Sequence, residues 1–224
     1  MKPGEGARRL GIWAAAGIVV LAALYIATGV AWLVQGGEAA ARHPFSPTDP
    51  HLAILEWLLV LVAPFMVAFA AAVHWYAPRD RQIFSLTALS FMIPAAAITC
   101  CVHFVRLVVA RHLDPDAAAH LAAVLSFNWP SVVFALDLLA WDLLAGIAML
   151  STAPVFPGGG LNRSIRVSLL LGGALCLAGF LGPATGDLRL QLPAIAGYAI
   201  VYPVSCLLIG VCFKKLGRKD RHAR

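Results

Sequence analysis

The chain has 224 residues, of which 61% are hydrophobic and 12% are charged, and its mean hydropathy is +0.83. Soluble domains contain about 45–50% apolar and about 25% charged residues, so this composition excludes an ordinary soluble domain. The formal net charge is +6, but the basic residues gather beside apolar stretches, which favours anionic lipid headgroups over nucleic acid as a partner.

Six stretches of the chain are apolar enough to cross a membrane, which takes about 20 residues per helix. In chain order they are residues 10–34, 52–76, 84–110, 129–152, 165–183 and 192–213. Little sequence lies outside them apart from an N-terminal segment, 1–9, and a C-terminal tail, 214–224. We therefore expect an all-α, polytopic membrane protein whose single domain covers residues 1–224.

The ends and connections of the spans predict their orientation. The first apolar run, of about 25 residues, is longer than a signal-peptide core of roughly 7–15 residues, so we expect it to be retained as a helix. Basic residues flank alternate connections: Arg8 and Arg9, Arg79 and Arg81, Arg163 and Arg166, and the tail from Lys214. By the positive-inside rule, both termini are expected to be cytoplasmic.

Turn-forming residues separate the spans. Glycine and proline residues are expected to break any helix between residues 35 and 51. Asp114 followed by Pro115 is typical of a helix N-cap and first turn, which predicts a short interfacial helix to about Leu125. The glycine run at 158–160 lacks a following Lys-Ser or Lys-Thr pair, so it predicts a flexible connector and not a phosphate-binding loop.

Prolines inside the spans indicate irregular helices, whereas the cysteines indicate neither a disulfide framework nor a metal site. Pro64, Pro94 and Pro203 interrupt the second, third and sixth spans, and we expect them to kink these helices and open a cavity between them. The five cysteines all fall within predicted spans, and no CxxC pair occurs. The sequence therefore predicts neither a disulfide framework nor a zinc site.

Five ionisable residues lie inside these apolar stretches: Glu56, His103, Arg106, Asp137 and Asp142. A charged group at bilayer depth costs about 3 kcal/mol or more, so such residues usually face the helix bundle, pair with one another and serve a function. With a rise of about 1.5 Å per residue, the first four are expected at matching depths in the outer half of the membrane. We therefore expect a buried polar site between the second, third and fourth spans.

Thr99 shares a face of the third span with His103 and Arg106, and Trp141 shares a face of the fourth span with Asp137. Tyr198 and Tyr202 form a polar-aromatic stripe on the sixth span. At about 100° per residue, Asp142 points about 140° away from Asp137. Glu56 and Arg106 also have a simpler interpretation as interfacial residues that extend to water, and His103 alone can be a hydrogen-bonded packing residue. Asp137 is harder to explain in this way, because a deep carboxylate cannot easily reach water.

Spans two to six resemble a family of small bacterial membrane proteins. The resemblance rests on five segments: EW at 56–57, HFVRL at 103–107, WPSVVFALDLLAWD at 129–142, GPATGD at 182–187 and GYAIVYP at 197–203. In these segments the chain is similar to the membrane-bound terpene cyclases of drimentine-type indole-terpenoid pathways. In its size, and in having a glutamate (Glu56) in one of its first helices, the chain also loosely resembles the fungal meroterpenoid membrane cyclases.

The resemblance implies cyclisation of a farnesyl-type prenyl chain on an aromatic or peptide-like head group, an isomerase or lyase reaction of terpenoid secondary metabolism. A protonated carboxyl group would start the reaction as a general acid, with Asp137 the first candidate and Glu56 and Asp142 the alternatives. His103 and Arg106 would orient or tune this acid. The residues expected to bind the substrate are Trp57, Thr99, Trp129, Trp141, Tyr198 and Tyr202.

The same resemblance implies neither a metal ion nor another cofactor. The expected partners are the lipid bilayer, a lipophilic prenylated substrate and an upstream prenyltransferase that makes this substrate. Two other functions fit the buried ionisable residues and kinked helices: a small proton-coupled transporter and a non-catalytic membrane partner whose buried charges only hold helices together. A water-filled path to both faces would favour the transporter, and an aromatic cavity closed on one side would favour the cyclase.

Overall fold

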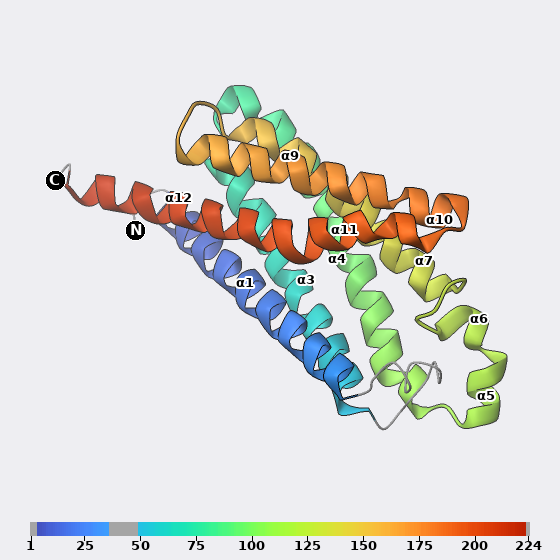
Figure 1. Ribbon diagram of the computed structural model, residues 1–224. Coiled ribbons are helices and arrows are strands. Elements are labelled where there is room, and N and C mark those ends of the chain that lie inside the picture. Colours follow the sequence, from blue (N-terminus) through green and yellow to red (C-terminus); the bar gives the residue numbers. More distant parts are fainter. Residues whose placement is uncertain (1–3, 36–48, 223–224) are drawn as a thin grey trace.

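The structure, a computed structural model, describes residues 4–35 and 49–222. Helices make up nearly all of the described chain, and no strand occurs in it (Figure 1). Six helical stretches of the described chain are long and apolar enough to cross a membrane: Glu5–Val34, Pro50–Tyr76, Arg79–His112, Val132–Val155, Leu161–Thr185 and Leu188–Gly217. These stretches confirm the prediction of an all-α, multi-pass membrane protein with six spans. The orientation of the termini stays a prediction.

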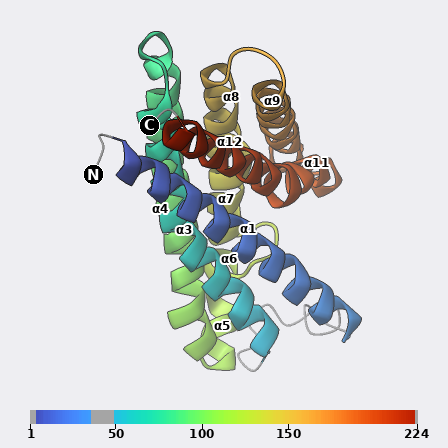
Figure 2. The same cartoon turned by 90° about the vertical axis from the view of Figure 1, so that its left-hand side faces the viewer.

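The first three spans run side by side. They contain α1 (Glu5–Val34), α3 (Pro50–Tyr76) and α4 (Gln82–Val108), with α1 packed on α3 and α3 on α4 (Figure 2). Asp49 caps α3 because its carboxylate accepts a 2.8 Å hydrogen bond from the His51 amide, an arrangement that stabilises a helix N-terminus. This cap fixes the register in which α3 presents Glu56.

The fourth and sixth spans are not regular α-helices. The fourth consists of α7 (Val132–Leu138), a π-helical segment (Leu139–Ala145) and α8 (Gly146–Thr152). The sixth consists of α11 (Leu192–Ala196), a second π-helical segment (Gly197–Val201) and α12 (Tyr202–His222). A π-helical segment widens the helix locally and often lies at a functional site. Pro203 lies just after the second segment and has no amide hydrogen to donate to the preceding turn, which favours this irregularity.

The fifth span closes the bundle with close backbone contacts. It contains α9 (Leu161–Gly179) and α10 (Leu181–Thr185), and α9 packs on α8, α11 and α12. A Cβ atom added to Gly179 would lie 2.2 Å from the Ala194 Cβ atom. Without a hydrophobic driving force between helices in lipid, small residues of this kind permit the close approach that holds them together.

In the part of the chain that the structure describes, the connections between the spans agree with the turns predicted from the sequence. Two short helices, α5 (Pro115–His120) and α6 (Ala122–Leu125), stand where one interfacial helix is expected, and the Asp114 carboxylate accepts a 2.9 Å hydrogen bond from the Ala117 amide. The 158–160 glycine run connects the fourth and fifth spans without an α-helix. The break expected between 35 and 51 lies mostly outside the described residues.

Candidate functional site

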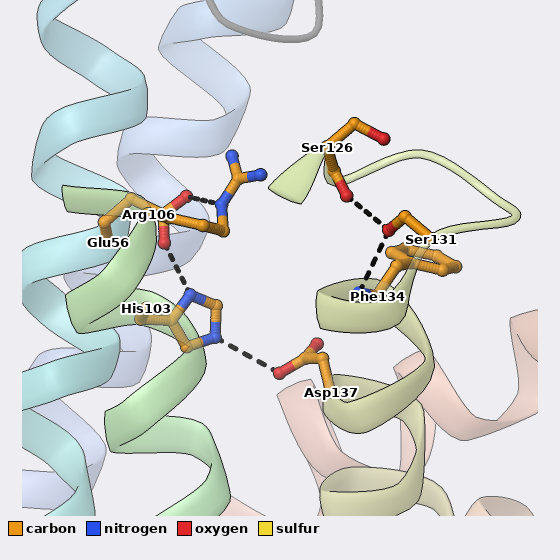
Figure 3. Close-up of polar contacts among 7 residues, drawn as sticks. All are labelled: Glu56, His103, Arg106, Ser126, Ser131, Phe134 and Asp137. Atoms are coloured by element: carbon orange, nitrogen blue, oxygen red, sulfur yellow. Dashed lines mark hydrogen bonds and ion pairs between the residues drawn. The ribbon is translucent and has the colours of Figure 1, made fainter. Parts of the chain in front are cut away.

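A chain of buried polar contacts links three of the spans. The His103 Nδ1 atom lies 2.6 Å from the Glu56 Oε2 atom, and its Nε2 atom lies 3.2 Å from the Asp137 Oδ1 atom (Figure 3). The Nε atom of Arg106 donates a 2.5 Å hydrogen bond to the other oxygen of Glu56. We call these four residues the charged cluster. The structure thus brings together the four residues whose depths match in the sequence.

Each residue of the charged cluster is placed by a simple local feature. His103 and Arg106 are three residues apart on α4, and this spacing puts both side chains on the side facing α3. Glu56 lies two turns after the capped start of α3. Asp137 lies in α7, whose start is fixed by Ser131: the Ser131 hydroxyl accepts a 3.2 Å hydrogen bond from the Phe134 amide.

The charged cluster is internally balanced. With His103 protonated, it holds two cations, Arg106 and His103, and two anions, Glu56 and Asp137, so its formal charge is zero. Moving one proton from His103 to Asp137 leaves that sum unchanged, because one cation and one anion disappear together. The cluster can therefore hold one proton on either side of the His103–Asp137 contact without placing a net charge in the membrane. Such a site can donate and recover a proton.

Phe127 covers the charged cluster at one side. Its ring centroid lies 4.5 Å from the Arg106 guanidinium carbon, a cation–π contact, and 5.7 Å from the centroid of the His103 ring. The Phe127 ring also packs edge-to-face on Phe134 at 5.1 Å. These contacts shield the cations of the cluster on one side.

A cavity of about 260 Å³ lies next to the charged cluster, and Asp137 is the cluster residue that lines it. Its walls come from α1, α3, the α6–α7 connection, the fourth span and the start of the sixth. The aromatic residues of the wall are Tyr25, Phe127, Phe134, Trp141, Tyr198 and Tyr202. Most of the remaining wall is aliphatic, so the cavity is suited to an apolar molecule with one carboxyl group facing it.

Three of the expected substrate-binding residues line this cavity. Trp141 and Tyr198 come from the two π-helical segments, and their ring centroids lie 5.3 Å apart. Tyr202 follows one helical turn after Tyr198. The two irregular segments therefore meet at the cavity wall and supply part of its aromatic surface.

The other three expected residues lie outside the cavity wall. Trp57 is 52% exposed on α3, because it follows Glu56 directly and points about 100° away from it. Thr99 is fully buried on α4. The centroid of the Trp129 ring lies 6.4 Å from that of Phe134, which is a wall residue, but Trp129 itself does not line the cavity.

Asp142 is separate from the charged cluster. It is fully buried, and neither of its carboxyl oxygens has a hydrogen-bond partner within 3.5 Å among the described residues. Asp142 lies within the π-helical segment Leu139–Ala145 and is not one of the residues that line the cavity.

Several wall residues were not singled out from the sequence. Tyr25 lies on α1 and interacts electrostatically with Asp137, Glu56 and Arg106. A tyrosine within the otherwise apolar first span was the available signal. Phe127 and Gln191 belong to the edges of connections, where periodicity gives no information about burial.

The described residues include no group of three or more histidine, cysteine, aspartate or glutamate side chains arranged to hold a metal ion. Fold and site together define a multi-pass helical membrane protein with a buried cluster of ionisable residues beside an aromatic cavity. Comparisons with protein families, with curated proteins and with solved structures find no match to this chain.

Proposed function

We propose that this chain is a membrane-bound terpene cyclase that starts ring closure by protonating a prenyl chain. The observation that carries the proposal is the position of Asp137, which lines an aromatic cavity and contacts His103 at 3.2 Å. A proton is thus held at the boundary between a charge-balanced cluster and a space suited to hydrocarbon.

The first chemical step is proton transfer from the Asp137 carboxyl group to an alkene carbon of the prenyl chain. The alkene π electrons form the new C–H bond, which leaves a carbocation on the neighbouring carbon and a carboxylate on Asp137. A second alkene of the same chain then attacks the cation and closes a ring. Transfer of a proton from a carbon next to the final cation to the Asp137 carboxylate restores the acid and gives a product with the mass of the substrate. Capture of water by that cation, with the extra proton of the water passing to the Asp137 carboxylate, gives a product heavier by one water molecule.

The other residues of the charged cluster prepare this step. Arg106 holds Glu56 ionised through a direct hydrogen bond, and Glu56 then accepts the Nδ1–H of His103. This arrangement leaves the Nε2 atom of His103 to exchange a proton with Asp137, because the neutral imidazole has one donor and one acceptor nitrogen. His103, Glu56 and Arg106 are therefore positioning residues for the acid Asp137.

The aromatic wall supports the cationic stage. The faces of Trp141, Tyr198 and Tyr202 can stabilise a positive charge by about 0.5–2 kcal/mol each where water is excluded. The aliphatic part of the wall, which includes Leu58 and Val62, keeps nucleophiles away from the cation. A carbocation that meets few nucleophiles can rearrange and cyclise before it is quenched.

The cellular setting is part of the same proposal. The protein would lie in the cytoplasmic membrane of a bacterium, with both termini cytoplasmic, and would take a lipophilic prenylated substrate from the bilayer. An upstream prenyltransferase would attach a farnesyl-type chain to an aromatic or peptide-like head group. No metal ion or other cofactor takes part in the steps above.

The proposal is tested with membranes that contain the expressed chain. They are incubated with farnesylated indole and farnesylated cyclodipeptide, and the products are separated by chromatography and weighed by mass spectrometry. The wild type is expected to give a product with a shifted retention time at unchanged mass or with one added water, and Asp137→Asn is expected to form it about 10²–10⁴-fold more slowly. If folded wild-type protein converts neither substrate, the proposal that the chain is a cyclase is contradicted.

The second candidate is a small proton-coupled transporter, and the specific observation in its favour is the 3.2 Å contact between the buried His103 Nε2 atom and the Asp137 Oδ1 atom. Proton pathways in membranes commonly use histidine and carboxylate pairs. A transporter would move protons across a sealed vesicle when its solute is added. The same wild-type and Asp137→Asn proteins, reconstituted with a pH-sensitive dye, separate the two functions.

A further inference from the structure

The cavity is closed at one end, where α1 crosses α12. Ile18 on α1 and Val62 on α3 lie at this end of the wall, because the two helices run in opposite directions (Figure 2). Both side chains are buried, with 1% and 7% of their surface exposed. One turn before Ile18, a Cβ atom added to Gly210 of α12 would lie 3.1 Å from the Ala15 Cβ atom. This close crossing closes the cavity behind Ile18 and Val62, which we call the floor.

The wall opens sideways at its other end, between α1 and α11. α1 packs on α12, and beyond this contact the first and sixth spans diverge (Figure 1, Figure 2). Ile26 on α1 and Ile195 on α11 are the most exposed residues that line the cavity in the described chain, at 43% and 41%. Two exposed neighbours on the sixth span, Leu192 and Ile200, are also apolar. An apolar surface of this kind on a membrane protein faces lipid, so the opening, which we call the mouth, leads into the bilayer.

A hydrocarbon chain fits a cavity of this shape with its free end inward. It can pass from the bilayer through the mouth without entering water. The floor is aliphatic, so a polar head group placed against Ile18 and Val62 would leave its polar atoms without partners there, at a cost in free energy. On the fourth span the wall runs from Phe134 through Asp137 to Trp141. A chain that follows this wall from the mouth to the floor therefore passes the Asp137 carboxyl group.

We propose that the floor sets the length of the prenyl chain, which enters between α1 and α11 and lies with its free end against Ile18 and Val62. This inference rests on the proposed function for the prenyl nature of the chain and adds the two residues that limit its length. A chain that is one isoprene unit too long must displace the floor or leave part of itself outside the mouth, and a close-packed interior resists such displacement. The expected substrate is therefore farnesylated and not geranylgeranylated.

The test is a competition between farnesylated indole and geranylgeranylated indole, which differ by one isoprene unit. The two ligands are mixed in equal amounts with the purified full chain in detergent, and native mass spectrometry gives the ratio of the two complexes. Wild type is expected to favour the farnesylated ligand. The double variant Ile18→Ala/Val62→Ala removes as many side-chain carbon atoms as one isoprene unit contains. It is expected to shift the ratio about tenfold towards the longer ligand, because the longer chain fills the space that the truncations leave.

The matched control is Val20→Ala/Ile54→Ala, which makes the same two changes on α1 and α3 at exposed positions away from the cavity. It is expected to leave the ratio unchanged. Both ligands partition into the same detergent in every sample, so a shift between variants comes from the protein. If the double variant of the floor does not fold, Val62→Ala alone is expected to shift the ratio in the same direction by a smaller factor.

An unchanged ratio in folded floor variants, an equal shift in the control, or no binding of either ligand to wild type would overturn the inference. Binding needs no turnover, so the outcomes for the floor and for the cyclase can be told apart. A ratio that depends on the floor without any cyclised product would count against the cyclase alone, whereas cyclised product with an unchanged ratio would count against the floor alone.

Discussion

The Nε2 atom of His103 lies 3.2 Å from the Oδ1 atom of Asp137, and this contact joins the third span to the fourth. Asp137 is the only member of the charged cluster that lines the cavity in the described chain. The contact is therefore the point at which a proton can pass from the charge-balanced cluster to a molecule in the cavity.

Replacing Asp137 by Asn is expected to lower the rate of cyclisation by about 10²–10⁴-fold, the usual contribution of a general acid. The amide keeps the shape of the side chain, so the protein should still fold. The measurement is product formation in membranes with matched protein amounts. Asp116→Asn, a change on the exposed side of α5, is the control and should leave the rate unchanged; an equal loss in both variants would contradict the role of Asp137.

Removing one charge from the cluster is expected to cost more stability than removing an opposite pair. Arg106→Gln leaves the charged cluster with one uncompensated negative charge, and breaking a buried ion pair in this way costs about 3–5 kcal/mol. The double variant Glu56→Gln/Arg106→Gln should be less destabilised than Arg106→Gln, because no uncompensated charge remains. Thermal unfolding in detergent measures the difference. Additive losses in the double variant would show that the two side chains are not coupled.

Replacing the cavity tryptophan, Trp141, and the surface tryptophan on α3, Trp57, is expected to affect product formation differently. Trp141→Ala is expected to change the ratio of cyclised products and lower the rate, because it removes an aromatic face from the wall. Trp57→Ala is expected to leave both unchanged, since Trp57 is largely exposed and does not line the cavity. The measurement is the ratio of cyclised products, determined by chromatography for each variant. A product change in Trp57→Ala that matched Trp141→Ala would mean that the cavity is not the reaction site.

Helix packing supplies a stability prediction with an internal control. Gly179→Ala places a Cβ atom 2.2 Å from the Ala194 Cβ atom, and overpacking of this kind typically costs about 1–3 kcal/mol. Gly159→Ala meets nothing within 4 Å and should leave the unfolding temperature nearly unchanged. Equal unfolding temperatures for the two variants would contradict the close packing of α9 against α11.

Asp49, just before the second span, predicts a dependence of stability on pH. Burial raises the pKa of Asp49, but hydrogen bonds from the Trp32 indole and from the His51 and Leu52 amides outweigh it, so the pKa lies below its ordinary value of 3.8. A carboxyl group with a lowered pKa contributes stability above its unfolded-state value, and this contribution is lost as the pH falls through the folded-state value. Asp49→Asn is therefore expected to unfold with a weaker dependence on pH below 3.8, as measured by thermal unfolding across an acid series.

The sequence predicts the six spans because their hydropathy is high and the breaks between them are rich in turn residues. It also predicts that Glu56, His103, Arg106 and Asp137 meet, since lipid offers charged groups no other partners, and the contacts agree with this expectation. The catalytic roles of these residues stay predictions. Their exact pairing depends on how α3, α4 and α7 pack, which no single stretch of sequence contains.

Other parts of the site could not be predicted for physical reasons. The π-helical segments insert an extra residue per turn, so a regular 100° increment per residue loses its accuracy after Leu139. Gln191 lies just before the sixth predicted span, 192–213, where a polar residue usually faces water. Its burial follows from the close approach of Gly182, a tertiary contact without a local signal.

The measurement that tests the central claim most directly is the incorporation of solvent deuterium. Membranes containing wild-type protein are transferred to heavy water, given the farnesylated indole, and the product is examined by mass spectrometry. If exchangeable proton transfer from Asp137 starts the reaction, each cyclised product molecule carries one deuterium on carbon, and Asp137→Asn forms this product about 10²–10⁴-fold more slowly. Cyclised product without deuterium, or deuterated product formed equally well by Asp137→Asn, would contradict it.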